Sequence, residues 1–150
     1  MDILTLDDFD LKGKTVLLRV DLNVPIDHDT KEILGEYRIE EAAITIKALD
    51  GAKIVVISHQ GRVGRKDFVG MENHAKVLEK FCGKKVKYVQ DVIGASAIEE
   101  IKNMNDDDII MLDNLRLCAE ENYEFSLEDS AKTIMAVSYT HLTLPTNREV

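Results

Sequence analysis

The chain has 150 residues, of which 45% are hydrophobic and 31% charged, a size and composition that suit one globular domain with its own core. Its formal net charge of -9 argues against general binding to nucleic acid or to an anionic membrane. Cys82 and Cys118 lie far apart without metal-binding spacing, no apolar run is long enough to span a membrane, and the N-terminus lacks a signal-peptide pattern. We therefore expect a cytoplasmic protein with reduced thiols.

The first predicted strand is the apolar run at 16–20, whose composition is typical of a strand buried on both faces. Arg19 interrupts this run, and Asp21 and Asn23 follow at alternate positions. Because alternate side chains of an extended chain point to the same side, we expect the three to project together where the strand ends. A buried guanidinium needs a carboxylate partner or an anionic ligand. An internal ion pair followed by an asparagine turn explains the same residues more simply.

The rest of the chain alternates between helices and strands. A helix is predicted from Arg38 to about Leu49, because apolar residues recur there at helical spacing and Gly51 follows as a stop. The further expected elements are a strand at 53–58, a helix at 71–81 closed by Gly83, a strand at 86–89, a helix at 97–104 with a possible cap at Ser96, a strand at 108–112, and a helix at 126–137.

This alternation predicts an α/β domain with a parallel sheet flanked by helices, in a Rossmann-like three-layer arrangement. Ligands of such sheets bind at the carboxyl ends of the strands. Polar or basic residues follow three of the predicted strands, and one more opens a helix: Asp21 and Asn23, His59 and Arg62, Arg116, and Arg38. The four basic residues of this set could clamp a phosphate, since the arginine fork binds phosphate bidentately.

Each of these residues also has a simpler explanation. A surface arginine is usually solvated, a histidine after a strand is usually structural, and Gly61 could serve only as a turn glycine. The segment 61–66 has the wrong glycine spacing for a P-loop, and no other nucleotide or nucleophile motif is present. In the acidic turn at 27–31, Lys31 stands where a calcium loop has an oxygen ligand and the required glycine is absent, so no metal site is predicted.

Taken together, four segments resemble phosphoglycerate kinases. Residues 18–25 (LRVDLNVP) resemble the R-V-D-F-N-V-P motif, 38–39 its basic helix start, 58–62 (SHQGR) the S-H-L-G-R-P loop, and 113–117 (DNLRL) the E-N-x-R-F segment. Order and spacing agree as well, and Gln60 together with the short first loop is most similar to archaeal members. The departures are Leu22 for Phe, Gln60 for Leu, Val63 for Pro, Asp113 for Glu and Leu117 for Phe, none of which removes a charged residue of the site.

The resemblance implies a two-domain kinase of which residues 1–137 form an incomplete N-terminal, substrate-binding domain. Residues 138–150 resemble translated sequencing-adapter text and are interpreted as a non-native tail. The complete protein would reversibly transfer phosphate from 1,3-bisphosphoglycerate to ADP, giving 3-phosphoglycerate and ATP in glycolysis and gluconeogenesis. The missing C-terminal domain would bind ADP or ATP with Mg²⁺. The fragment alone, expected to be a monomer, would bind phosphoglycerate at most and lack activity.

The resemblance also implies a set of substrate-binding residues: Asp21, Leu22, Asn23, Arg38, His59, Gln60, Gly61, Arg62 and Arg116. Asp21 and Asn23 would hold the glycerate end of the substrate. His59, Arg62 and Arg116 would bind the phosphate that is not transferred. Arg38 would be the catalytic residue that reaches the migrating phosphoryl group, whereas Arg19 is expected to pair internally and stiffen the strand end.

Two alternatives from other functional classes remain. A stand-alone α/β module could bind phosphate without catalysis. A nucleic-acid-binding domain could use Arg62, Arg65 and Lys66, but the charge of -9 and the lack of interleaved aromatic residues argue against it.

Overall fold

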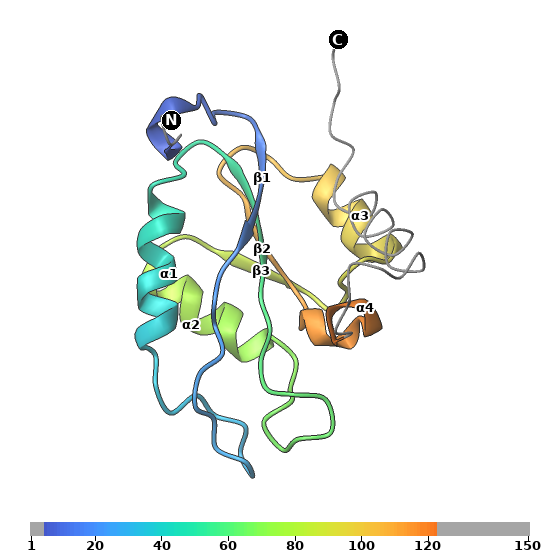
Figure 1. Cartoon of the computed structure of the whole chain (residues 1–150). Helices are drawn as coiled ribbons and strands as arrows, with labels where there is room; N and C mark the ends of the chain where they lie inside the picture. Colours follow the sequence, from blue (N-terminus) through green and yellow to red (C-terminus); the bar gives the residue numbers. More distant parts are fainter. Residues whose placement is uncertain (1–4, 123–150) are drawn as a thin grey trace, which may run out of the picture.

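The structure, a computed structural model, describes residues 5–122 as a parallel β-sheet with helices on both of its faces (Figure 1). The four strands of this part of the chain are ordered β1-β2-β4-β3, and all three pairings are parallel. In sequence the elements are η1 (Leu6–Asp8), β1 (Thr15–Arg19), α1 (Tyr37–Lys47), β2 (Lys53–Ile57), α2 (Glu72–Cys82), β3 (Val86–Val89), α3 (Ala95–Lys102), β4 (Ile109–Leu112), η2 (Leu115–Leu117) and α4 (Ala119–Asn122). The predicted α/β fold with a parallel sheet is confirmed.

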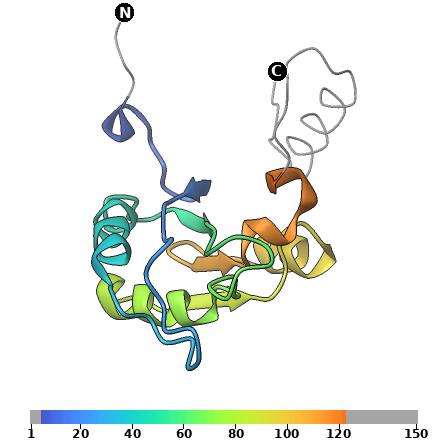
Figure 2. The ribbon, with the colours of Figure 1, turned by 60° about the horizontal axis from the view of Figure 1, so that its bottom comes forward.

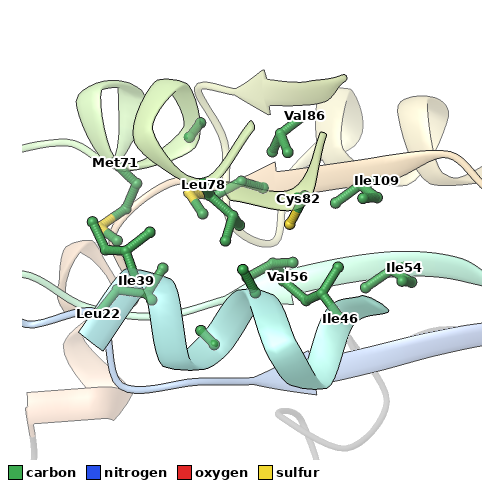
Figure 3. Packing of buried hydrophobic residues seen from close by; sticks show 14 of the residues in the cluster. Leu22, Ile39, Ile46, Ile54, Val56, Met71, Leu78, Cys82, Val86 and Ile109 are labelled. Atoms are coloured by element: carbon green, nitrogen blue, oxygen red, sulfur yellow. The ribbon is translucent and has the colours of Figure 1, made fainter. Parts of the chain in front are cut away.

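Helices α1 and α2 cover one face of the sheet and α3 covers the other, which gives the three predicted layers (Figures 1 and 2). Because successive strand side chains point to opposite faces, Val56 of β2 packs with Ile39 and Leu78 of the two helices (Figure 3), whereas Val55 packs in the second core with Ala97 of α3. Burial from both sides explains the continuous apolar runs of β2 and β4. Each fully buried aliphatic side chain contributes roughly 1.5–3 kcal/mol.

The helix boundaries lie close to the predicted ones, with one difference at the start of α3. Gly83 closes α2 in the left-handed conformation at φ +69°, as predicted. Ser96 is not the cap of α3, however, because the helix already begins at Ala95. The free backbone N–H groups at the start of α3 donate instead to the carboxylate of Asp91. This carboxylate accepts from the N–H groups of Gly94 and Ala97 at 2.9 and 3.0 Å.

The prediction that the first strand is buried on both faces is wrong. Within residues 5–122, β1 pairs only with β2 and lies at the edge of the sheet. Its apolar centre is half-buried, and the side chain of Arg19 is 54% exposed. Arg19 nevertheless forms the predicted internal ion pair, because its guanidinium donates to both carboxylate oxygens of Glu121 in α4. Exposed ion pairs of this kind contribute about 0–1 kcal/mol to the free energy of unfolding.

The predicted helix at 126–137 and the predicted tail at 138–150 lie outside the described residues. In the part of the chain that is described, no helix has the length and apolar character needed to cross a membrane.

Candidate functional site

The carboxyl ends of β1, β2 and β4, which are neighbours in the sheet, bring the predicted residues to one edge. Asn23 follows β1, Arg62 follows β2, and Arg116 lies in η2 just after β4. Arg38 reaches this edge from the first turn of α1, where its guanidinium forms an ion pair with the carboxylate of Asp21. The structure therefore places residues from four separate segments together, as parallel topology requires.

A cleft of about 720 Å³ opens at this edge. It is lined by Asn23, His28, Gly61, Arg62, Gly64, Arg65, Lys66, Asp67 and Arg116. Five residues of the predicted set do not line it: Asp21, Leu22, Arg38, His59 and Gln60. Asp21 accepts from the N–H of Asn23, and Arg38 pairs with Asp21. Its volume lies within the range of pockets that hold small molecules, and its walls are strongly basic in a chain of net charge -9.

The segment after β1 is held in place by side chains that follow β2. The hydroxyl of Ser58 accepts from the backbone N–H of Leu22 at 3.0 Å and donates to the carbonyl of Val20 at 2.7 Å. The amide of Gln60 accepts from the N–H of Val24 and donates to its carbonyl, both at 3.0 Å. These bonds continue the β1–β2 ladder beyond the strands and fix the backbone on which Asp21 and Asn23 stand.

Two members of the predicted substrate-binding set, Leu22 and Gln60, have buried side chains, and their place in that set stays a prediction. The side chain of Leu22 is fully buried in the core, and Gln60 is only 1% exposed with its amide engaged by protein groups. In this structure both side chains contact protein groups. Their role is to position the neighbouring residues.

Gly61 lies where the segments after β1, β2 and β4 meet. Its N–H donates to Oδ1 of Asn23 at 3.0 Å, and its carbonyl accepts from the guanidinium of Arg116. Its backbone has φ +66°, and a Cβ atom would stand 2.3 Å from the carbonyl oxygen of Asp67. Only glycine fits this position, and Gly61 links two site residues.

Asn114 is a positioning residue that the sequence analysis missed. It is fully buried, and its Nδ2 donates at 2.7 Å to the carbonyls of both Gln60 and Val69. These two residues flank the segment 61–68, called the basic loop below. Its Oδ1 accepts from the backbone N–H of Arg116 at 3.1 Å. The available signal was an amide residue placed directly after a buried strand, but its backbone partners could not be read from the sequence.

The electrostatic environment of His59 combines burial with nearby charges. Burial lowers its pKa, the guanidinium of Arg116 lowers it further, and the carboxylates of Asp21 and Glu121 partly oppose this. At neutral pH the ring is therefore mostly uncharged. A bound phosphate would stabilise the imidazolium and raise this pKa.

A second histidine, His74 of α2, lies behind the site. It is 1% exposed, and its Nε2 lies 3.0 Å from Oε1 of Gln60. Its Nδ1 is buried and has no hydrogen-bond partner within residues 5–122, and burial lowers the pKa of His74 to about 4. This neutral ring supports the glutamine that holds the segment after β1.

Acidification is expected to destabilise the chain through His74. Its pKa is 6.5 in an unfolded chain and about 4 in the folded one, so the unfolded state takes up a proton first as the pH falls. The stabilisation is complete above the unfolded pKa, and about 2–3 kcal/mol of it is lost on approaching pH 4. Urea unfolding as a function of pH, for the wild type and His74→Gln, measures this loss as a change in the difference between them. A difference that stays constant with pH would contradict the assignment.

The described residues offer no place for a metal–nucleotide complex. Between residues 5 and 122, no group of three His, Cys, Asp or Glu side chains is arranged to hold a metal ion. The glycines near the cleft also lack the spacing of a phosphate-binding nucleotide loop. The Mg²⁺ and nucleotide implied by the sequence resemblance therefore do not fit this part of the chain.

Fold and site together define an α/β domain that presents a basic cleft at the carboxyl ends of parallel strands, an arrangement suited to a phosphorylated small molecule. The family model of phosphoglycerate kinase matches residues 6–142, and the chain belongs to this family.

Two relatives and two solved structures illustrate the match. The chain is 46% identical over 134 residues to phosphoglycerate kinase from Methanosarcina mazei, covering 89% of this chain and 32% of that protein. It is 48% identical over 141 residues to the enzyme from Methanococcus maripaludis, covering 88% and 34%. The crystal structure of phosphoglycerate kinase from Pyrococcus horikoshii has a TM-score of 0.79 at 32% identity, covering 93% of this chain and 35% of that one. The Coxiella burnetii structure gives 0.64 at 26% identity, covering 81% and 31%.

The chain thus spans about a third of the length of the curated relatives it matches. The predicted resemblance to archaeal phosphoglycerate kinases is confirmed. These matches give no support to the alternative of a stand-alone phosphate-binding module.

Proposed function

We propose that this chain is the phosphoglycerate-binding part of a phosphoglycerate kinase. The complete protein would reversibly transfer a phosphoryl group from 1,3-bisphosphoglycerate to ADP. The observation that carries this proposal is the convergence of Arg38, His59, Arg62 and Arg116 beside Asp21 and Asn23 at one sheet edge. The boundary at 137 and the non-native character of 138–150 stay predictions.

Arg62 and Arg116 are proposed to bind the phosphate that is not transferred. Both line the cleft, and Arg62 forms no ion pair with a carboxylate among residues 5–122. Arg116 is oriented by the carbonyl of Gly61, which leaves its remaining guanidinium N–H groups for a ligand. His59, close to Arg116, would add a further ring N–H.

Asn23 and Asp21 are proposed to hold the glycerate end. The N–H of Gly61 occupies Oδ1 of Asn23, so the amide NH₂ is the group left for a ligand oxygen. The carboxylate of Asp21 can accept from a hydroxyl. Its ion pair with Arg38 is more than half exposed on both sides and worth about 0–1 kcal/mol, so a ligand could rearrange it.

Arg38 is proposed as the catalytic residue. When released from Asp21, its guanidinium could neutralise the negative charge on the migrating phosphoryl group. Such a transfer needs no protein nucleophile, because positioning and electrostatic stabilisation carry it. The location of Arg38 in the first turn of α1 also aligns the positive end of the helix dipole with the anion.

ADP or ATP with Mg²⁺ is proposed to bind on a second domain outside this chain. Closure of the two domains would bring nucleotide and phosphoglycerate together and exclude water. The present chain alone is accordingly expected to have no kinase activity. The monomeric state and the cytoplasmic location stay predictions.

Calorimetric titration of the 150-residue chain with 3-phosphoglycerate tests this proposal. Arg62→Ala should weaken binding about 10- to 100-fold, because it removes a charge-assisted contact to phosphate. Arg38→Ala should cost less than about fivefold, since its main partner develops only in the transition state. Lys47→Ala, at the exposed end of α1, serves as the control and should leave affinity unchanged. Equal losses for Arg62→Ala and Lys47→Ala, or no binding by a folded chain, would overturn the proposal.

A further inference from the structure

A hollow of about 380 Å³ lies at the carboxyl ends of β3 and β4, apart from the basic cleft. Tyr88 of β3 lines it, as do Gln90 and Asp113, which follow β3 and β4, and no described residue lines both spaces. Its volume is near the lower end of the range in which pockets hold small molecules. We propose that this hollow binds a small organic cation, a primary alkylammonium compound. The inference does not depend on the proposed function.

Asp113 places a buried negative charge in the wall of the hollow. The residue is 5% exposed and forms no ion pair within residues 5–122. Its Oδ1 accepts from the backbone N–H groups of Met71 at 3.0 Å and Asn114 at 2.7 Å, which stabilise the carboxylate without neutralising its charge. Because a buried carboxylate is costly unless a cation faces it, a cationic ligand would gain from binding here.

Glu72 adds a second carboxylate to the lining from the first turn of α2. Its ion pair with Lys76, at 2.8 Å, is more than 60% exposed on both sides. Such a pair is weak, so Glu72 can exchange this partner for a ligand ammonium group.

Two aromatic side chains, Phe68 and Tyr88, complete the features that suit a cation. Burial, a hydrogen bond to Asp113, and the charges of Asp113 and Glu72 together raise the pKa of Tyr88, so its hydroxyl stays protonated and its ring neutral. Within residues 5–122, the one cation that lies over an aromatic ring is Lys80, above Phe81. The rings of Phe68 and Tyr88 therefore remain available for a cation–π contact with an alkylammonium group.

The other polar groups of the lining offer mainly acceptors. Lys31 is the one cation among the described residues that line the hollow, and its Nζ already donates to the carbonyls of His28 and Lys66. Asn73 uses its Nδ2 to donate to the carbonyl of Lys31 at 3.3 Å, which leaves its Oδ1 for a ligand. The amide of Gln90 makes no hydrogen bond within the described part of the chain. A donor-only group such as an ammonium matches this lining better than an anion does.

Gly70 leaves space beside the buried carboxylate. A Cβ atom at this position would stand 3.1 Å from Oδ1 of Asp113 and 3.3 Å from the hydroxyl oxygen of Tyr88. The backbone of Gly70 does not have a positive φ, so its conformation does not itself require glycine. What the missing side chain provides is room for a small group next to these two polar atoms.

The test is an NMR titration of the 150-residue chain with n-butylamine, which is protonated at pH 7, and with 1-butanol as the uncharged probe of similar size. Butylammonium should bind at least about tenfold more tightly than butanol and shift the signals of Tyr88 and Gln90. Asp113→Asn should weaken butylammonium binding about tenfold or more, and Glu72→Gln about 3- to 10-fold. Glu41→Gln is the matched control, because it removes an exposed carboxylate from α1 and lowers the net negative charge equally.

Equal affinities for butylammonium and butanol, or equal losses for Glu72→Gln and Glu41→Gln, would overturn the site. A peptide with one central lysine that binds more tightly than butylammonium, with the same loss in Glu72→Gln, would overturn the assignment to a small molecule. Urea unfolding identifies folded variants, and Glu72→Gln decides the question if Asp113→Asn does not fold. Glu72→Gln should keep its affinity for 3-phosphoglycerate within about twofold, so failure of this site and failure of the proposed function are distinguishable.

Discussion

Replacing Gly61 by alanine is expected to lower the free energy of unfolding by about 3 kcal/mol or more and to abolish 3-phosphoglycerate binding. The added Cβ atom would stand 2.3 Å from the carbonyl oxygen of Asp67 and 2.6 Å from the amide nitrogen of Phe68. Both are backbone atoms, which cannot rotate away as a flexible side chain can. The loop would have to move, and it would take with it the groups that orient Asn23 and Arg116. Urea unfolding and calorimetry measure the two effects.

Gly64→Ala is the matched control for this prediction. Gly64 lies in the same loop with φ +80°, but a Cβ atom there would have no neighbour within 4 Å. It should therefore cost only the strain of a left-handed alanine, about 1 kcal/mol, and leave binding nearly unchanged. If Gly61→Ala and Gly64→Ala have the same effect, the close contact at Gly61 does not determine the loop conformation.

Replacing Asn114 by alanine is expected to cost about 2–4 kcal/mol of stability, because it leaves buried polar groups without partners. The carbonyls of Gln60 and Val69 would each lose a donor at 2.7 Å, and the N–H of Arg116 would lose its acceptor. Binding of 3-phosphoglycerate should weaken as well, since both the basic loop and Arg116 depend on this amide.

Asn122→Ala provides the comparison for Asn114. Its amide makes bonds of the same kind, to the carbonyls of Arg116 and Cys118 at 2.8 and 2.9 Å, but it is exposed. Water can replace such bonds, so the expected loss is less than about 1 kcal/mol. A loss at Asn114 no larger than that at Asn122 would show that the buried amide does not stabilise the loop.

The location of the site was predictable because parallel topology leaves little choice. Once the strands before Asp21, His59 and Arg116 were recognised, their carboxyl ends had to meet at one edge. The continuous apolar runs of β2 and β4 indicated a parallel sheet, because both strands are buried on two faces.

The errors have a common physical origin, which is that a sequence shows what a side chain is but not what packs against it. The run in β1 looks like that of β2, yet β1 has one neighbouring strand within residues 5–122 and its Arg19 is exposed. The contacts of Gln60 were equally hidden, because its amide bonds to the backbone of Val24, a partner 36 residues away in the chain. The amide of Asn114 likewise bonds to backbone groups that are distant in the chain, the carbonyls of Gln60 and Val69.

The most direct test of the central claim is an NMR titration of the 150-residue chain with 3-phosphoglycerate, followed at the backbone amides and the arginine side-chain Nε–H groups. The account predicts that the signals of Arg62, Arg116 and Gly61 shift together and saturate. Shifts that gather instead around the separate hollow of about 380 Å³ lined by Tyr88 and Gln90 would place the ligand elsewhere and contradict the account.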